Sequence, residues 1–206
     1  MYWNKSNISY DILIPPLKKH VSELDKLEAK EYFEWYLQCL PARISYLSEV
    51  SKCVLDGSFD SLIPLWHWFL IVAKIEKTPT AKLNMIKRFL NKQSNPFINE
   101  IIDESSTQFS LQTEYIIRDI GMYLGNVFVK FSDKIKWGYH TDIEKDSFAN
   151  TPLLTGFEDA KFTPPFKMEF EPVHMTKVQA SNIFDNTASD TDLYNLCLHW
   201  VSHIPK

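Results

Sequence analysis

The sequence predicts an α+β protein, with a mostly helical N-terminal half followed by a small antiparallel sheet that helices cover. Two observations lead to this class. Apolar residues recur about every 3.6 positions from about residue 24 to residue 131, and beyond Ser132 the period changes to 2. Because 206 residues of 45% hydrophobic composition suffice for one core, we expect a single domain over 1–206, with a helical part at about 10–131 and the sheet plus C-terminal helices at about 132–206.

Helical patterns account for the first half. The segment EAKEYFEWYLQCL at 28–40 gathers its apolar residues on one face, and Pro41 predicts a break or a kink before the pattern resumes at 42–55. A third helix at about 61–76 is apolar nearly all round and is therefore expected to be central.

Capping residues mark the next helices. Thr80 is expected to cap a fourth helix, and Asn95-Pro96 to begin a short fifth one. The polar segment ESSTQ at 104–108 is expected to be a linker, after which Ser110 caps the longest helix, which runs to about residue 131.

Gly121 and Gly125 lie nearly on one side of that longest helix. Each glycine costs up to about 1 kcal/mol of helix stability relative to alanine, so the close approach of another element is expected to compensate. The bare flank predicts that another helix, or the strand at 135–140, lies against it.

Strand patterns follow. In IKWGYH at 135–140 and in FKMEFE at 166–171, apolar and polar residues alternate, as in strands with one buried face. PLLTGF at 152–157 is a third candidate strand. The segment 173–184 favours a helix, and the last 16 residues return to a helical pattern.

The charge is unevenly distributed. Residues 1–103 hold 13 Lys+Arg against 12 Asp+Glu, a net charge of +1, whereas residues 104–206 hold 9 against 14, a net charge of −5. An acidic half disfavours nucleic acid and favours a basic partner. The start of the chain lacks a signal-peptide pattern, and the most apolar stretch, at 62–73, is shorter than the roughly 20 residues that span a bilayer. Three cysteines without CxxC spacing fit reduced thiols, so we expect a cytoplasmic protein that does not insert into a membrane.

Motifs of known catalytic chemistry are missing: the sequence contains no GxSxG, P-loop, HExxH, CxxC or GxGxxG pattern. His199 and His203 stand four residues apart and form half a metal site at most, with solvated histidines as the simpler interpretation. His67, in WHW, is expected to be a neutral, hydrogen-bonded core histidine. No cofactor or metal is therefore expected.

The best site candidate is the loop YHTDIEKD at 139–146, where a histidine and carboxylates follow an aromatic strand end. A solvated loop is its simplest interpretation, and the spacing does not fit an EF-hand. An acidic loop on a rigid strand also suits the binding of a basic protein. The residues expected to bind a partner are Tyr139, His140, Asp142, Glu144, Asp146, Glu158 and Asp159.

Residues 119–157 carry a resemblance. The run Tyr123-Leu124-Gly125-Asn126-Val127-Phe128, then Trp137, then Pro152-Leu153-Leu154-Thr155-Gly156-Phe157, resembles uncharacterised bacterial proteins with the pattern Y-L-G-E-V-F, W, P-x-L-x-G-F. Some of these look like immunity proteins encoded beside polymorphic toxins, which bind a cognate toxin domain and block it. The resemblance implies a non-enzymatic, cytoplasmic binding protein. Asn126 departs from the glutamate usual at its position.

Three functional hypotheses result. The first is an immunity-type protein whose acidic surface occludes the active site of a basic toxin. The second is a small hydrolase or transferase that uses His140 together with Asp142, Asp146 or Glu158, and it predicts a pocket holding these groups with a shifted pKa. The third is a scaffold with a peptide groove in the helical half. The oligomeric state is left open.

Overall fold

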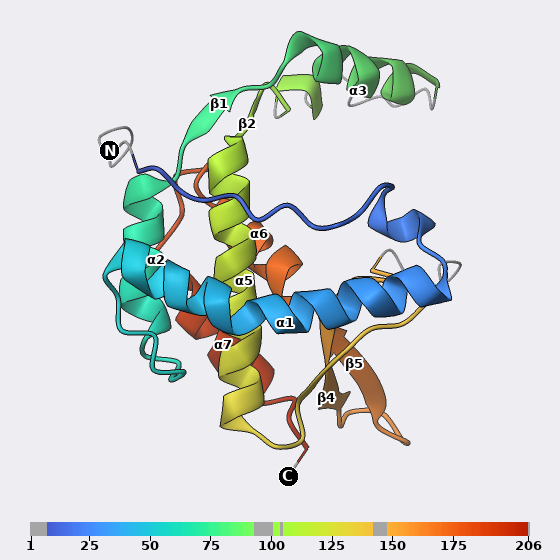
Figure 1. Ribbon diagram of the computed structural model, residues 1–206, viewed down its shortest axis with the longest axis vertical. Helices are drawn as coiled ribbons and strands as arrows, with labels where there is room; N and C mark the ends of the chain where they lie inside the picture. Colours follow the sequence, from blue (N-terminus) through green and yellow to red (C-terminus); the bar gives the residue numbers. More distant parts are fainter. Residues whose placement is uncertain (1–7, 93–100, 104, 142–147, 206) are drawn as a thin grey trace.

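The computed structural model describes residues 8–92, 101–103, 105–141 and 148–205, and it confirms the α+β class. Helix α5 stands in the middle of the molecule and helix α1 crosses it (Figure 1). The elements are the 3-10 helix η1 (Val21–Glu23), α1 (Lys26–Ser51), α2 (Leu62–Val72), β1 (Ile75–Lys77), α3 (Thr80–Lys92), β2 (Thr107–Phe109), α5 (Leu111–Phe131), β3 (Lys136–Gly138), β4 (Leu153–Asp159), β5 (Phe166–Phe170), α6 (Pro172–Ser181) and α7 (Asp192–Val201). Among these helices none has the length and apolar character needed to cross a bilayer.

Helix α1 is one continuous helix, so Pro41, where a break or a kink was expected, does not break it. It starts with a capping box, in which Asp25 accepts the N–H groups of Leu27 and Glu28, and Glu28 accepts the N–H of Asp25. Pro41 lies on the exposed side. The missing hydrogen bond is tolerated because buried residues on both sides of Pro41 hold the two halves against the body: Tyr36, Leu40, Arg43 and Leu47.

Helix α2 is shorter and less central than expected. It ends at Val72, and Ile75, which was assigned to the same helix, begins strand β1. Five residues face the core (Leu62, Leu65, Trp66, Phe69 and Val72), but His67 and Ile71 are exposed. The helix therefore covers one side of the core and is not surrounded by it.

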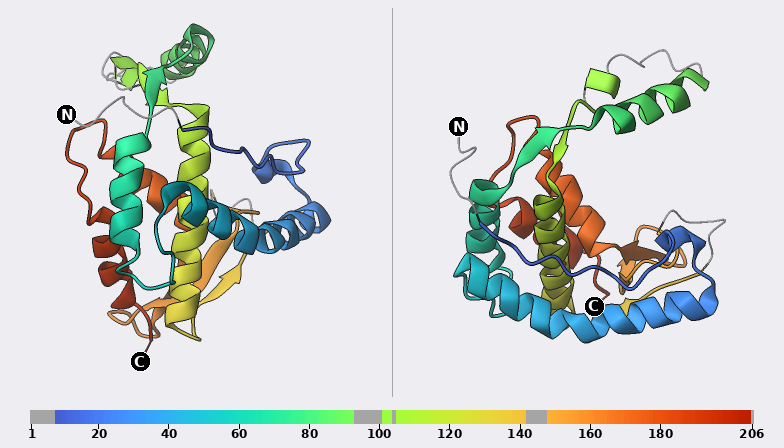
Figure 2. Two further views of the ribbon diagram at one scale, coloured as in Figure 1. Left: turned by 60° about the vertical axis from the view of Figure 1, so that its left-hand side comes forward. Right: turned by 45° about the horizontal axis from the view of Figure 1, so that its top comes forward.

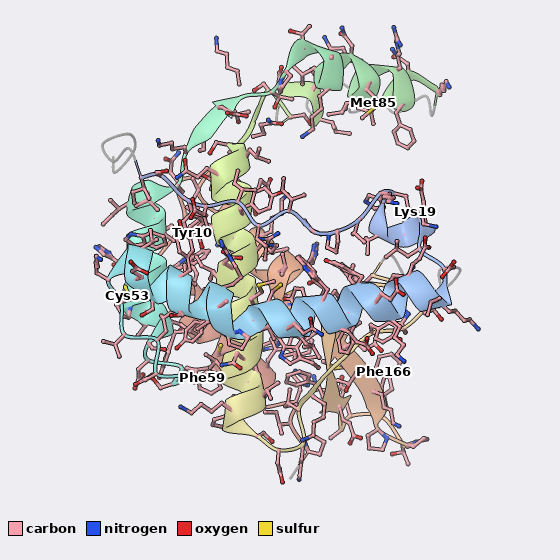
Figure 3. All side chains as sticks on the ribbon, in the orientation of Figure 1. Tyr10, Lys19, Cys53, Phe59, Met85 and Phe166 are labelled. Atoms are coloured by element: carbon pink, nitrogen blue, oxygen red, sulfur yellow. The ribbon has the colours of Figure 1, made fainter. Side chains whose placement is uncertain are left out.

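Strands β1 and β2 form an arm, defined here as Ile75–Phe109, which projects from the end of α5 and carries α3 (Figures 1 and 2). The two strands pair antiparallel, with Ile75 opposite Phe109. The linker expected at 104–108 is therefore wrong at Thr107 and Gln108, which belong to β2. On α3, Met85 and Phe89 are 65% and 60% exposed, and the position of Met85 on the arm can be followed in Figure 3. The start of the expected fifth helix, at 95–96, lies outside the described residues.

The second sheet has the order β3-β4-β5 and is antiparallel throughout, as predicted. Its buried aromatic residues pack on α5 and α7: the ring of Phe128 lies 5.5 Å from that of Phe157, and Trp200 lies 4.7 Å from Phe170. The alternation of β5 is only partly buried, since Phe170 is buried and Phe166 is 61% exposed. The predicted helix at 173–184 is confirmed as α6, whereas α7 ends at Val201 rather than at the C-terminus.

The two glycines of α5 lie where other elements touch its backbone. A Cβ at Gly121 would be 2.6 Å from the Cα of Val173, and one at Gly125 would be 2.3 Å from the Trp137 ring. The expected close approach is confirmed on both counts, because the start of α6 and the strand β3 both lie against this flank.

Residues 8–19, called here the N-terminal strap, cross α5 and run beside α1 without regular structure (Figure 1). Side chains from both helices hold the strap by its backbone carbonyls. Arg43 donates to the carbonyl of Asp11 at 2.9 Å, Arg118 donates to that of Leu13 at 2.6 Å, and Gln112 donates to that of Ile8.

Candidate functional site

Tyr139 and His140 directly follow β3 and lie where the sheet meets α1. The ring of Tyr139 packs on Phe33 of α1 with 4.8 Å between the ring centroids. The Nε2 atom of His140 lies 3.3 Å from the Oε2 atom of Glu169 on β5. The carbonyl of His140 accepts the N–H of Asn150 at 2.7 Å. The strands β3 and β5 and the helix α1 therefore bring an aromatic ring, an imidazole and a carboxylate together at one end of the sheet.

The structure separates the predicted acidic residues. Gly138 pairs with Leu153 at the start of β4, whereas Glu158 and Asp159 are its last residues, about 17 Å further along at about 3.3 Å per residue. Glu158 lies opposite Lys167 of β5, and Asp159 accepts the N–H of Lys161 at 3.0 Å. Tyr139 and His140 are thus not grouped with Glu158 and Asp159. Asp142, Glu144 and Asp146 lie outside the described residues.

Glu171, which the sequence did not single out, has the most strongly shifted pKa of the carboxyl groups near this end of the sheet. It caps α6, and its carboxylate accepts the N–H of Val173 at 3.2 Å and the N–H of His174. Burial raises the pKa of Glu171 to about 7, although the two N–H donors lower it. An acid directly before Pro172 is a sequence signal for this cap, because proline favours the first position of a helix.

Two tyrosines of α1 share the electrostatic environment of Glu171. The pKa of Tyr32 is raised to about 12, chiefly by burial; the charge of Arg118 lowers it and that of Glu171 raises it by smaller amounts. Tyr36 is fully buried, which raises the pKa of its hydroxyl in the same way, and its ring packs edge-on against Trp137. These phenols stay protonated at neutral pH, and their rings pack on neighbouring aromatic side chains: Tyr32 stacks on Trp35 and Tyr36 contacts Trp137.

The remaining histidines have surface positions. His67 is not a core histidine: its side chain is 50% exposed and its Nδ1 lies 3.0 Å from Asp190. His199 and His203 pack ring against ring at 5.2 Å, at the end of α7. In the described ranges, no group of three His, Cys, Asp or Glu side chains is arranged to hold a metal ion.

The pocket expected for an enzyme would combine His140 with Asp142, Asp146 or Glu158. Glu158 is at the far end of β4, and the other two residues are not described. The carboxylate beside His140 is Glu169, and the carboxyl with the raised pKa is Glu171. Both oxygens of Glu171 already accept N–H groups of α6, which commits them to the helix cap.

Comparison with protein families, with curated proteins and with solved structures returned no match to this chain.

Proposed function

We propose that this protein is a non-enzymatic binding protein that neutralises a toxin by covering its active site. The observation that supports this function is the surface made by Tyr139, His140 and Glu169, which projects from three packed elements. Aromatic side chains are enriched in protein interfaces, and a carboxylate beside one adds charge complementarity toward a basic partner. The resemblance of residues 119–157 to immunity-type proteins gives the class of partner.

The partner is expected to be basic at the surface that is covered. Glu169 is 42% exposed, and in the described part of the chain it pairs with His140, which carries a charge only when protonated. A lysine or arginine of the partner can therefore form a charge-assisted hydrogen bond with Glu169, while Tyr139 supplies apolar contact area. Long-range attraction by the acidic second half would raise the association rate.

The test uses protein expressed in its native host and captured with its partners. Wild type is expected to retain a basic protein that is toxic when expressed alone, and coexpression of the two is expected to restore growth. Glu169→Lys should abolish both capture and protection, because it places a like charge at the interface. Asp185→Lys reverses a charge in the same way at an exposed residue after α6 and is the matched control.

Two results would contradict the proposal. If the Glu169→Lys variant retains the partner with wild-type affinity, the surface made by Tyr139, His140 and Glu169 is not part of the interface. Failure of the captured protein to inhibit growth would remove the toxin-neutralising role, even if binding persisted.

A further inference from the structure

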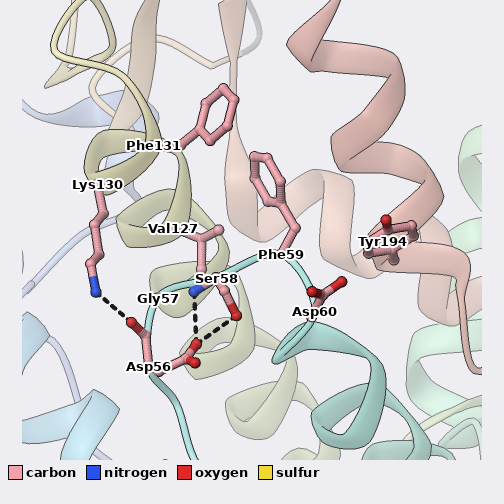
Figure 4. A pocket seen from close by; sticks show the side chains of 9 residues that line it. All are labelled: Asp56, Gly57, Ser58, Phe59, Asp60, Val127, Lys130, Phe131 and Tyr194. Atoms are coloured by element: carbon pink, nitrogen blue, oxygen red, sulfur yellow. Dashed lines mark hydrogen bonds between the residues drawn. The ribbon is translucent and has the colours of Figure 1, made fainter.

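A second surface feature is an open pocket of about 680 Å³ at the C-terminal end of α5. It lies between the loop 56–60, the last turn of α5 and the start of α7 (Figure 4). It shares no residue with the Tyr139–Glu169 surface, and no motif in the sequence indicates it.

The loop at the pocket is held in one conformation by its own hydrogen bonds. The Asp56 carboxylate accepts the N–H of Ser58 at 2.8 Å and its hydroxyl at 2.6 Å. Gly57 has a φ of +79°, and its N–H donates to the Tyr123 hydroxyl at 2.9 Å. A Cβ at Gly57 would lie 2.5 Å from the Cδ of Lys130, so the lysine stem also packs on the loop. The pocket wall is therefore preorganised.

The charges of the pocket are divided between two sides. Lys130 donates from Nζ to the carbonyl of Asp56 on one side, while Asp60 and Tyr194 lie on the other (Figure 4). Hydrogen bonds from Ser58 lower the pKa of Asp56, so its carboxylate is ionised and balances Lys130. Asp60 is exposed, and within residues 8–92, 101–103, 105–141 and 148–205 no donor reaches its carboxylate. Among the described residues that line the pocket, the charge of Asp60 is therefore the one that Lys130 does not balance.

Aromatic rings line the same pocket. Phe59 and Phe131 lie 4.8 Å apart between ring centroids, tilted by 41°. Phe131 is 53% exposed even though it follows the buried residues Val127 and Phe128 of α5. The faces of such rings attract cations, and a carboxylate beside them adds a full opposite charge.

We propose that this pocket binds an organic cation, with its ammonium or guanidinium group between Asp60 and the rings of Phe59 and Phe131. Tyr194 closes the side next to Asp60 and offers its hydroxyl. The same chemistry belongs to a lysine or arginine side chain of a protein and to a small quaternary amine.

The test is an NMR titration of the full chain, labelled with nitrogen-15, that follows the backbone amides of Gly57–Asp60. The probes are choline, Nα-acetyl-lysine methylamide and the neutral 3,3-dimethylbutan-1-ol, which has the shape of choline without its charge. Both cations are expected to give saturable shifts, and the alcohol is expected to bind at least about threefold more weakly. Tighter binding of the lysine derivative identifies a protein side chain as the natural ligand, and tighter binding of choline identifies a free amine.

Four variants locate the interaction. Asp60→Asn is expected to weaken cation binding about three- to fivefold and to leave the alcohol unaffected. Phe131→Leu is expected to weaken cation binding about two- to fivefold. Asp185→Asn and Phe162→Leu make the same changes at exposed positions outside the pocket and are expected to have no effect. The proposal is overturned if neither cation gives saturable shifts, if the alcohol binds as tightly as choline, or if Asp60→Asn binds both cations like wild type.

Discussion

Arg43 of α1 and Asp119 of α5, 76 positions apart in the sequence, form a buried ion pair between the two helices. The guanidinium Nε lies 2.9 Å from Asp119 Oδ2, and the two side chains are 10% and 0% exposed. The hydroxyl of Tyr10 donates to the same carboxylate oxygen at 2.6 Å. One carboxylate therefore fixes the crossing of α1 over α5 and also holds the N-terminal strap.

Replacement of Asp119 is expected to be strongly destabilising. Asp119→Ala leaves the buried guanidinium of Arg43 and the hydroxyl of Tyr10 without their acceptor, so we expect a loss of about 3–5 kcal/mol in the free energy of unfolding. Tyr10→Phe removes one hydrogen bond to a charged group and should cost about 1.5–3 kcal/mol. Urea unfolding measures both, with the exposed Asp133→Asn as control. A loss below 1 kcal/mol for Asp119→Ala would contradict the assigned role.

Alanine at Gly121 is expected to destabilise the protein although alanine favours helices. Its Cβ would be 2.6 Å from the Cα of Val173, which is backbone and cannot move aside independently of α6. The steric overlap, including the displacement of α6 that it forces, is expected to cost about 1–3 kcal/mol. This cost exceeds the gain in helix propensity, which is up to about 1 kcal/mol. Gly138→Ala is the control, since its nearest neighbour would be 3.4 Å away. If thermal unfolding shows the Gly121 variant to be the more stable protein, the close packing of α6 on α5 is wrong.

Glu171 is expected to make stability depend on pH. Burial raises the pKa of Glu171 from 4.5 to about 7, so the folded state holds the proton more tightly than the unfolded state. Its contribution to stability is complete below about pH 4.5 and is lost as the pH rises through about 7. Relative to wild type, Glu171→Gln should therefore gain about 2–3 kcal/mol between pH 4.5 and pH 8.

The measurement is a series of urea unfolding curves across that pH range. Gln179→Ala on the same helix is the control. Neither glutamine nor alanine titrates, so the difference in free energy of unfolding between this variant and wild type should not change with pH. A pH-independent difference for Glu171→Gln would mean that the carboxyl is not buried in the folded protein.

Asn150 links the 3-10 helix η1, which precedes α1, to His140 at the candidate site. Its Nδ2 donates to the carbonyls of Val21 and Leu24 at 3.0 and 3.1 Å, and its backbone N–H donates to the backbone carbonyl of His140. Its φ of +66° also disfavours most side chains. Asn150→Ala is expected to cost about 2–4 kcal/mol, and Asn150→Gly about 1 kcal/mol less, because glycine tolerates that φ.

Asn186 provides the comparison for Asn150. It is exposed and has a φ of +56°, but its side chain makes none of these bonds. Asn186→Ala should therefore cost only the backbone term, about 1 kcal/mol. Equal losses at the two positions in chemical unfolding would show that the Asn150 side chain contributes nothing.

The sequence predicted most helices and all three strands of the larger sheet because these depend on periodicity within one segment. It failed where distant segments decide the outcome. Thr107 and Gln108 were predicted to lie in a polar linker, but they form part of β2 and pair with Lys77 and Glu76 of β1. Pro41 was predicted to break or kink the helix. The helix continues through it, because the burial of neighbouring side chains outweighs one missing hydrogen bond.

The candidate site was predicted only in part for the same reason. Tyr139 and His140 were identified as the end of a strand, which is local information. Their neighbours Phe33 and Glu169 depend on the register of β3, β4 and β5 and on the path of α1. Glu171 was read as the polar face of a strand, whereas its position before Pro172 makes it a helix cap.

The arm leaves the body and returns to it at two paired residues, Ile75 and Phe109. Directly opposed residues of antiparallel strands have Cα atoms only about 4.5–5.5 Å apart, so a short turn could join them if everything between were removed. The arm is thus topologically an insertion, and the chain outside it forms a continuous path from α2 into α5. Its length and composition can vary without rerouting any other element, which makes it the natural place for a shortened variant or a fused reporter domain.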